Sequence, residues 1–346
     1  MMMPINLLLF AALFLSCNQP KNIDSYLITL HEDGKLNGNV LVVQNDTVLY
    51  ENSFGYADGT KEERLNQDYR FNIGSIYKEF PAVAIMQLHE KGKLKLSDKL
   101  SLYVAGLPSW SDSITIKSLL QYSSGLPTIK FDEHFSKGTT VTEEIIMDDL
   151  KNVEQLEFKP GTDYLYTNYS PMLLIQIVED IAKHNFTSYT QQNLFHPYGL
   201  IQSRINSQYP YKDKTLMAIP FDEDFEEDSY SIKVDWILFS STTYDMYRWF
   251  KHLDSYDIIS KESMKNLSEE AIQGDNIQAP LGRGDWENDD IKLHLHHGSS
   301  GNYESLVRHY KQDGLMIILL TNQKHGNVHE IADNIYQILQ RRVAEE

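Results

Sequence analysis

Residues 75–92 read SIYKEFPAVAIMQLHEKG, a largely apolar run that begins with a serine and a lysine. The run predicts a helix over residues 75–91 that ends at Gly92. Its apolar side chains fall on nearly every side of that helix and include Ile76, Phe80, Val83, Ala84, Ile85, Met86 and Leu88. A helix that is apolar all round is buried in the interior of a domain. Pro81 removes one helical hydrogen bond and can kink the helix.

Ser75 and Lys78 are three residues apart, so they share one face of this helix. A serine hydroxyl is a weak nucleophile until a base takes its proton. Burial and a helix N-terminus both lower the pKa of a lysine, which would let Lys78 act as that base. A Ser-x-x-Lys pattern occurs nowhere else in the chain. A buried Ser–Lys pair with a purely structural role is the alternative.

Tyr166 and Asn168 are separated by one residue and follow the turn at residues 160–161. In an extended loop, two such residues point the same way. A phenol can shuttle protons and an amide can bind a substrate carbonyl, so both are candidate site residues. Residues 50–52 (YEN) have the same spacing at a predicted strand end, and the chain has 21 tyrosines, so packing is the alternative role.

Residues 294–301 read HLHHGSSG. In a strand, His294 and His296 share a face and could form a metal pair, but no further motif completes such a site, so we predict no metal. We expect instead a strand that lines a cleft, in which the His296 side chain forms a polar part of the wall and Gly298 lets the backbone come close to a ligand. The backbone N–H groups of Ser75 and Ser299 could then form an oxyanion hole. An edge strand with surface histidines is the alternative.

The remaining pattern places strands near both ends of the chain and helices in the middle. Strands are predicted at residues 39–44, 47–51, 292–297, 303–310 and 315–321, and helices at 116–122, 142–150, 172–183, 187–194, 243–253 and 327–342. The acidic segment 221–231 (FDEDFEEDSYS) is predicted to be a solvated loop. This pattern predicts an α+β fold, with an antiparallel sheet built from both termini and a second, mostly helical lobe. We expect one domain over residues 24–340, with a sheet lobe at about 24–74 and 240–346 and a helical lobe at about 75–239.

Composition excludes several classes of protein. The 346 residues are 41% hydrophobic, which suits a globular domain with a sizeable core. A net charge of −18 argues against sequence-independent nucleic-acid binding, which needs lysine and arginine. A single cysteine excludes a disulfide framework and a multi-thiolate metal site. The chain has no Gly-x-Ser-x-Gly elbow and no Walker-type loop.

The single cysteine, Cys17, follows an uncharged apolar run at residues 7–15 (LLLFAALFL). This run is too short to span a bilayer comfortably and is typical of a secretory signal. Because Ser16-Cys17 follows directly, residues 1–17 resemble a bacterial lipoprotein signal in which Cys17 becomes the lipidated first residue. We therefore expect an exported cell-envelope or periplasmic protein held at a membrane by Cys17. A plain cleaved signal or an ordinary apolar N-terminus is the alternative.

Six segments, together and in this order, resemble the serine β-lactamase and penicillin-binding protein superfamily. They are residues 71–78 (FNIGSIYK), 88–100 (LHEKGKLKLSDKL), 114–127 (ITIKSLLQYSSGLP), 160–174 (PGTDYLYTNYSPMLL), 241–249 (STTYDMYRW) and 315–322 (LMIILLTN). The nearest likeness is to the class C β-lactamase, D-aminopeptidase and esterase branch. The resemblance covers about residues 38–340 and implies a helix-flanked antiparallel sheet with the active site between it and a helical lobe.

The resemblance also implies roles. Ser75 would be acylated, Lys78 and Tyr166 would share proton transfer, and Asn168 would orient the substrate. Residues 296–298 would occupy the family's third motif, and no metal or organic cofactor is implied. Which of Lys78 and Tyr166 is the general base stays open, because coupled groups titrate together.

The chain departs from the family pattern at several positions. His296 stands where the lactamases usually have lysine, and esterases and peptidases of the branch often have histidine. A neutral imidazole supplies less fixed positive charge for a substrate carboxylate than lysine does. Residues 235–240 (DWILFS) replace a glycine-rich approach, which predicts a bulkier pocket edge. Pro81 and Tyr122 also differ from the usual family residues.

These features predict a serine hydrolase that forms an acyl-enzyme on ester, amide or peptide bonds of a small-molecule or peptide substrate. Esterase or D-residue peptidase activity is favoured over β-lactamase activity. A penicillin-binding D-Ala-D-Ala carboxypeptidase is an alternative, and a non-catalytic receptor for envelope ligands is another. No protein partner is predicted.

Overall fold

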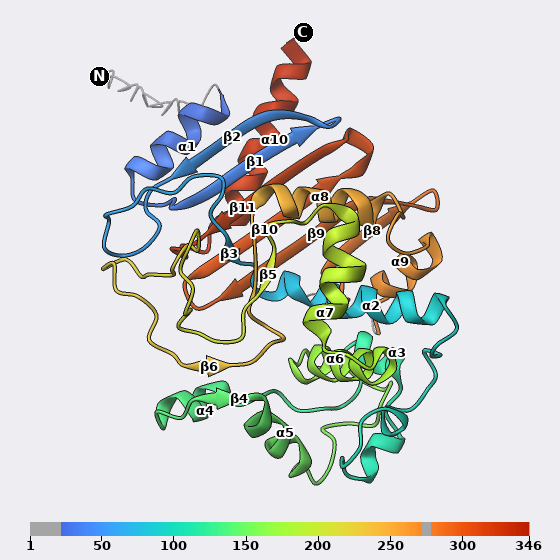
Figure 1. Ribbon diagram of the computed structural model, residues 1–346. Helices are drawn as coiled ribbons and strands as arrows, with labels where there is room; N and C mark the ends of the chain where they lie inside the picture. Colours follow the sequence, from blue (N-terminus) through green and yellow to red (C-terminus); the bar gives the residue numbers. More distant parts are fainter. Residues whose placement is uncertain (1–21, 272–277, 346) are drawn as a thin grey trace, which may run out of the picture.

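A six-stranded antiparallel sheet drawn from both ends of the chain is the frame of the molecule (Figure 1). The computed structural model describes residues 22–271 and 278–345. The strand order is β2-β1-β11-β10-β9-β8. The strands are β1 (Gly38–Gln44), β2 (Thr47–Phe54), β8 (Arg283–Glu287), β9 (Asp290–Ser300), β10 (Tyr303–Tyr310) and β11 (Leu315–Thr321). The sheet expected from the sequence pattern is therefore confirmed.

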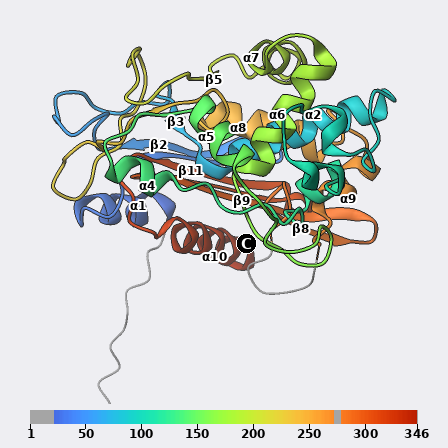
Figure 2. The same ribbon diagram turned by 90° about the horizontal axis from the view of Figure 1, so that it is seen from below.

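Both faces of the central strands are covered, which explains why β11 (LMIILLT) is apolar without alternation and is buried throughout. Val40 and Val42 of β1 face one cluster together with α1 (Ile23–Glu32) and α10 (Val328–Glu345). Leu41 and Val43 face a second, larger cluster that includes α2 (Glu79–Glu90) and α8 (Thr243–Asp254). Figure 2 shows these two helix layers on opposite sides of the sheet.

The middle of the chain forms most of the remaining helices, and most of these lie below the sheet in Figure 1. These helices are α3 (Ile116–Leu120), α4 (Phe131–Ser136), α5 (Glu143–Lys151), α6 (Tyr169–Ala182) and α7 (Phe186–Thr190), and α9 (Lys261–Ser268) follows α8. Short strands accompany them, namely β3 (Phe71–Asn72), β4 (Val141–Thr142), β5 (Arg204–Ile205), β6 (Ile232–Lys233) and β7 (Phe239–Ser241). The α+β class predicted from the sequence is confirmed.

Two helix predictions were wrong in detail. The predicted helix over 75–91 is a 3₁₀ turn, η1 (Gly74–Lys78), followed by α2. Pro81 is the third residue of α2, where its missing N–H has no partner within α2, so it breaks no hydrogen bond of that helix. The predicted helix over 187–194 is α7 followed by one π-helical turn at Gln191–Phe195.

The N-terminal predictions fall outside the part of the chain that the structure describes. Residues 1–21 are not described, so the predicted signal segment and Cys17 lie outside it. Among the described residues, no helix has both the length and the apolar character needed to cross a membrane.

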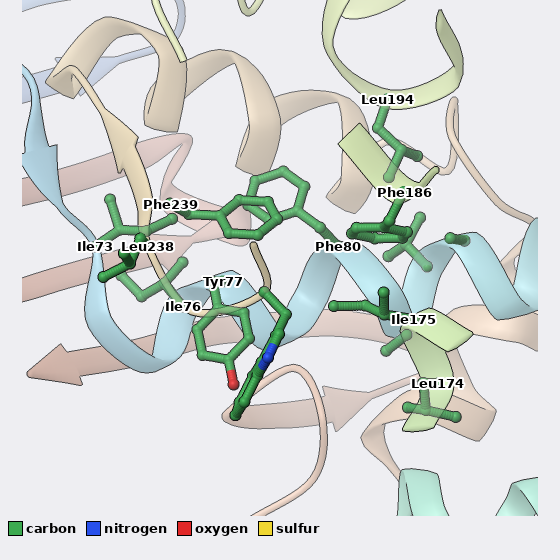
Figure 3. Close-up of a cluster of buried hydrophobic side chains, with 14 of the residues drawn as sticks. Ile73, Ile76, Tyr77, Phe80, Leu174, Ile175, Phe186, Leu194, Leu238 and Phe239 are labelled. Atoms are coloured by element: carbon green, nitrogen blue, oxygen red, sulfur yellow. The ribbon is translucent and has the colours of Figure 1, made fainter. Parts of the chain in front are cut away.

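An aromatic cluster joins the start of α2 to the elements around it (Figure 3). The Phe80 ring is fully buried and lies 5.2 Å from the Phe239 ring of β7, centroid to centroid. It lies 4.3 Å from the Trp249 ring of α8 and 5.4 Å from the Phe195 ring of the π-helical turn. Because Phe80 follows Lys78 by two residues, this packing fixes the segment that carries Ser75 and Lys78.

Replacing Phe80 by alanine should lower the free energy of unfolding by about 3–5 kcal/mol, because a buried ring is lost and its neighbours close the cavity only in part. Urea unfolding followed by circular dichroism measures the change. Leu102→Ala is the control, since that side chain is 67% exposed, and it should change stability by less than about 0.5 kcal/mol. Equal effects of the two substitutions would contradict the central packing role of Phe80.

Candidate active site

The hydroxyl of Ser75 is the meeting point of two polar side chains. Lys78 Nζ donates a hydrogen bond to Ser75 Oγ over 3.0 Å. The Tyr166 hydroxyl donates to the same oxygen over 2.9 Å. Tyr166 lies 91 residues from Ser75 along the chain, so the tertiary fold brings it to the Ser-x-x-Lys pair. The structure thus places together the three residues that the sequence indicated as catalytic.

Two glycines let the backbones of η1 and β9 touch beside Ser75. A Cβ atom on Gly74, whose φ is +52°, would lie 2.3 Å from the Ser299 nitrogen. A Cβ atom on Gly298 would lie 2.0 Å from the Ile73 carbonyl oxygen and 2.8 Å from the Ser75 nitrogen. Both distances are too short for any side chain, so the close approach requires glycine. The backbone N–H groups of Ser75 and Ser299 therefore lie on adjoining segments at the same site.

The loop that carries Tyr166 is anchored on both sides. Thr167 Oγ1 donates to the Pro127 carbonyl over 2.6 Å. The Tyr122 ring, which departs from the family pattern, lies 4.7 Å from the Tyr166 ring. Asn168 is the N-cap of α6, and its Oδ1 accepts a long hydrogen bond of 3.4 Å from the Tyr77 hydroxyl. These contacts hold Tyr166 and Asn168 on the Ser75 side of the loop.

A pocket of about 330 Å³ opens at Ser75. Its walls come from η1, the α4 segment, β6 and the end of β9, and its lining residues are Gly74, Ser75, Tyr77, Lys78, Phe131, Asp132, Phe135, Asn168, Tyr230, Ile232, Ile237, Ser299, Ser300 and Gly301. Ile237 belongs to the segment at 235–240 in which we expected a bulkier pocket edge. Ser75, Lys78, Asn168 and Ser299 thus share one pocket.

His296 and His294 are placed differently from what the sequence suggested. They are 3% and 0% exposed, so the alternative of surface histidines on an edge strand is wrong. His296 is not among the residues that line the pocket, and its Nδ1 lies 2.6 Å from Glu79 Oε1. His294 Nε2 lies 3.2 Å from the same Glu79 oxygen. Within the described residues, no group of three or more His, Cys, Asp or Glu side chains could hold a metal ion.

Burial sets the protonation of the two groups that contact Ser75. It lowers the pKa of Lys78 to about 7. It raises the pKa of Tyr166 to about 12, although the hydrogen bond with Ser75 acts in the opposite direction. Both shifts favour the neutral form of each group, as desolvation always does. Near neutral pH the site therefore holds a neutral phenol and an amine that can exist in either form.

The sequence did not predict the aromatic wall of the pocket or the role of Glu79. Phe131, Phe135 and Tyr230 come from loops and short elements with no distinguishing pattern, so their meeting at Ser75 is set by the tertiary fold alone. Glu79 did carry a signal, because it is an acidic residue directly before seven apolar, buried residues of the same helix, 80–86. A fully buried carboxylate next to Lys78 requires partners, and the sequence alone did not show which.

The beta-lactamase family pattern matches residues 23–342. The chain belongs to the beta-lactamase family. It is 27% identical to "Penicillin-binding protein 4*" of Bacillus subtilis over 91% of this chain and 74% of that protein. It is 25% identical to "Protein flp" of Staphylococcus aureus over 93% of this chain, and it spans 66% of that protein's length.

Solved structures share the fold of this chain. A penicillin-binding protein from Bacillus halodurans superposes with a TM-score of 0.75 at 22% identity, over 93% of this chain and 99% of that one. A class C beta-lactamase superposes with a TM-score of 0.73 at 16% identity, over 92% of this chain and 94% of that one. The fold expected from the resemblance, a helix-flanked antiparallel sheet of the β-lactamase and transpeptidase type, is confirmed.

Replacing Lys78 by methionine should stabilise the protein at neutral pH. The unfolded lysine has an ordinary pKa of 10.5 and the folded one a pKa of about 7, so between these values the unfolded state binds more protons. The stability of the wild type relative to Lys78→Met should therefore fall as the pH falls from about 10.5 to about 7, by on the order of 4 kcal/mol, and then level off.

Urea unfolding of both proteins from pH 6 to pH 10 measures this difference. Lys183→Met is the control, because the Lys183 side chain is 74% exposed and its removal should leave the pH dependence unchanged. A constant stability difference between wild type and Lys78→Met across this range would contradict the lowered pKa of Lys78.

Proposed function

We propose that this protein is a serine hydrolase that acts through an acyl-enzyme on ester, amide or peptide bonds. The observation that carries the proposal is the pair of hydrogen bonds that Ser75 Oγ receives from Lys78 Nζ and the Tyr166 hydroxyl. A nucleophile within hydrogen-bonding reach of a base, beside a pocket, is the arrangement that nucleophilic catalysis requires. Membership of the beta-lactamase family supports the same chemistry.

In the acylation step, Ser75 Oγ forms a bond to the substrate carbonyl carbon while the Ser75 proton passes to the base. The carbonyl oxygen becomes an oxyanion, which the backbone N–H groups of Ser75 and Ser299 stabilise. When this intermediate collapses, the bond to the leaving group breaks, and the leaving group takes a proton from Lys78 or Tyr166. A water molecule then attacks the acyl-enzyme by the same steps and releases Ser75.

Lys78 is the better candidate for the general base. A base is most effective when its pKa is near the working pH, and the buried Lys78, with a pKa of about 7, meets that condition. Tyr166, with a pKa of about 12, stays protonated at neutral pH and is suited to pass a proton to the leaving group. Asn168 lines the pocket and supplies an amide that can orient the substrate carbonyl.

Esters and peptides with D-residues are the favoured substrates. Among the described residues that line the pocket, Lys78 is the only basic one, and it is committed to Ser75. The third motif carries His296, and burial lowers the pKa of this imidazole, so it adds no fixed positive charge for the carboxylate of a β-lactam. The aromatic wall of Phe131, Phe135 and Tyr230 suits an apolar group on the substrate.

One contact favours a second candidate, a D-Ala-D-Ala carboxypeptidase. The exposed Lys324 donates from Nζ to Ser299 Oγ over 3.0 Å, and Ser299 lines the pocket. This ammonium group could bind the free carboxylate of a peptide C-terminus at the rim of the pocket. A receptor that binds envelope ligands without turnover is the third candidate, and the intact contacts of Ser75 argue against it.

Ser75→Ala should abolish hydrolysis of a short-chain chromogenic ester, with a loss of at least about 10³-fold in kcat. The same assay with a chromogenic cephalosporin and a fluorescent penicillin separates the candidates, and intact-mass measurement detects the acyl-enzyme. Ser170→Ala is the matched control, because that buried hydroxyl has no hydrogen-bond partner among the described residues and lies outside the pocket lining.

Ester turnover lost only in Ser75→Ala supports the favoured substrates. Stable labelling by penicillin without turnover indicates a carboxypeptidase or receptor. Turnover that survives in Ser75→Ala contradicts the serine mechanism.

Export and membrane attachment through a lipid on Cys17 are part of the proposal, and the apolar run before Ser16-Cys17 supports them. In a bacterial host, the full-length chain should be found in the membrane fraction, and mass spectrometry should find an acylated N-terminal Cys17. Cys17→Ser should move the protein to a soluble fraction or leave its signal uncleaved. An unmodified N-terminus in the wild type would contradict lipidation.

A further inference from the structure

Behind the site, three imidazoles and two carboxylates alternate in one connected line. His296 Nδ1 lies 2.6 Å from Glu79 Oε1, which lies 3.2 Å from His294 Nε2. His294 Nδ1 lies 2.8 Å from Asp254 Oδ1, and Asp254 Oδ2 lies 2.6 Å from His309 Nδ1. The first four side chains are at most 4% exposed, and His309 is 13% exposed. We call these five residues the buried relay.

The topology explains how the buried relay assembles. His294 and His296 alternate with Leu295 on β9, so both face α2. His309 lies on β10 directly opposite His294 in the strand register. Glu79 begins α2 and Asp254 ends α8, so two helix ends bring the carboxylates onto the same face of the sheet.

The hydrogen-bond partners indicate which atoms of the relay carry protons. Glu79 Oε2 accepts from Trp249 Nε1 over 2.6 Å, while Glu79 Oε1 faces the two imidazoles. His294 Nδ1 faces Asp254, and His294 Nε2 lies 3.0 Å from the Leu281 carbonyl oxygen, which can only accept. The pKa of Asp254 is held below its ordinary value, so this carboxylate is ionised and both His294 nitrogens carry protons, which makes the ring an imidazolium between two carboxylates.

The charges agree with this assignment. Burial acts to lower the pKa of His294, but Asp254 and Glu79 raise it well above its ordinary value. Burial, helped by the charges of His294 and Lys78, lowers the pKa of His296 below its ordinary value even though Glu79 acts to raise it, so this ring is neutral at neutral pH. A neutral His296 that donates to Glu79 carries its proton on Nδ1 and leaves Nε2 without one.

His296 is close enough to the site for its state to matter. It shares a strand face with Gly298, whose Cβ position would lie 2.8 Å from the Ser75 nitrogen. The charge of Lys78 also acts on His296 and helps to lower the pKa of this imidazole. A change in the charge or tautomer of His296 would therefore alter the electrostatic environment of Lys78 and Ser75.

We propose that Glu79 is a positioning residue for the hydrolase, and that it holds His296 in one orientation and one tautomer beside Lys78. His294 and Asp254 support it by keeping Glu79 ionised and in place. The inference rests on the proposed function, because positioning is measured here through turnover at Ser75. The proposal assigns Glu79, His294 and His296 a role in that reaction.

Glu79→Gln tests the proposal. A glutamine has one acceptor and one donor end, so it cannot accept from both Trp249 and His296. We expect kcat for the chromogenic ester to fall on the order of 10²-fold with little change in KM, because the substitution misplaces the reacting groups but does not weaken substrate binding.

Ring ¹⁵N NMR of histidine-labelled wild type should show His296 as the Nδ1–H tautomer and His294 as an imidazolium at pH 7. Glu79→Gln should alter the His296 signals.

Asp245→Asn is the matched control, because Asp245 is also a fully buried acid on α8. It accepts from the Ser203 hydroxyl over 2.8 Å and from Arg248 Nη1 over 2.9 Å, and neither of these partners belongs to the relay. It should lower stability without changing the imidazole signals or kcat. If Glu79→Gln does not fold, Asp254→Asn replaces it as the test, because Asp254 contacts the other side of the His294 ring. We expect Asp254→Asn to remove one proton from His294 and to lower kcat.

Wild-type kcat together with unchanged imidazole signals in these relay variants overturns the proposal. A wild type in which His296 carries its proton on Nε2 also overturns it. Turnover that survives in Ser75→Ala refutes the proposed function instead, while the NMR result still decides the tautomer of His296.

Discussion

The burial of Lys78 is the constraint on which the site depends. Its side chain is 4% exposed, and Ser75 is its one hydrogen-bond partner within the described residues. The rings of Tyr77 and Tyr166 lie 4.6 and 4.9 Å from its Nζ and give limited cation–π compensation. An ammonium group with so few partners is poorly stabilised, so the neutral amine is favoured. The fold thus produces a lysine that can take a proton from Ser75.

A lysine that is buried without a carboxylate partner requires rigid surroundings. Aromatic packing around Phe80 fixes the first turn of α2, and Gly74 and Gly298 bring the backbone of β9 against η1. These contacts restrict how far Ser75 and Lys78 can move toward water. A site that disfavours the charged form of its own lysine trades stability for reactivity, as functional sites commonly do.

The sequence pattern predicted the sheet and the local pairing of Ser75 with Lys78, but it did not predict the contacts between side chains from distant segments. Ser75 and Lys78 were paired correctly because residues three apart meet on a helix, and in the 3₁₀ turn that forms they eclipse even more closely. Tyr166 could be assigned only through the order of motifs that resembles the family, because spacing alone did not distinguish it from residues 50–52. His296 was expected on the cleft wall, yet it turns toward Glu79, since the partner of a buried imidazole comes from a distant element.

Lys78 and Glu79 are adjacent in sequence, oppositely charged and both buried, yet the structure keeps them from pairing. Glu79 is occupied by His294, His296 and Trp249, while Lys78 faces Ser75. If the carboxylate paired with the ammonium group instead, the charged lysine would be stabilised and would no longer be an effective base. The histidines of β9 therefore do more than satisfy a buried acid: by engaging Glu79, they leave Lys78 without a carboxylate partner, as its proposed role as the base requires.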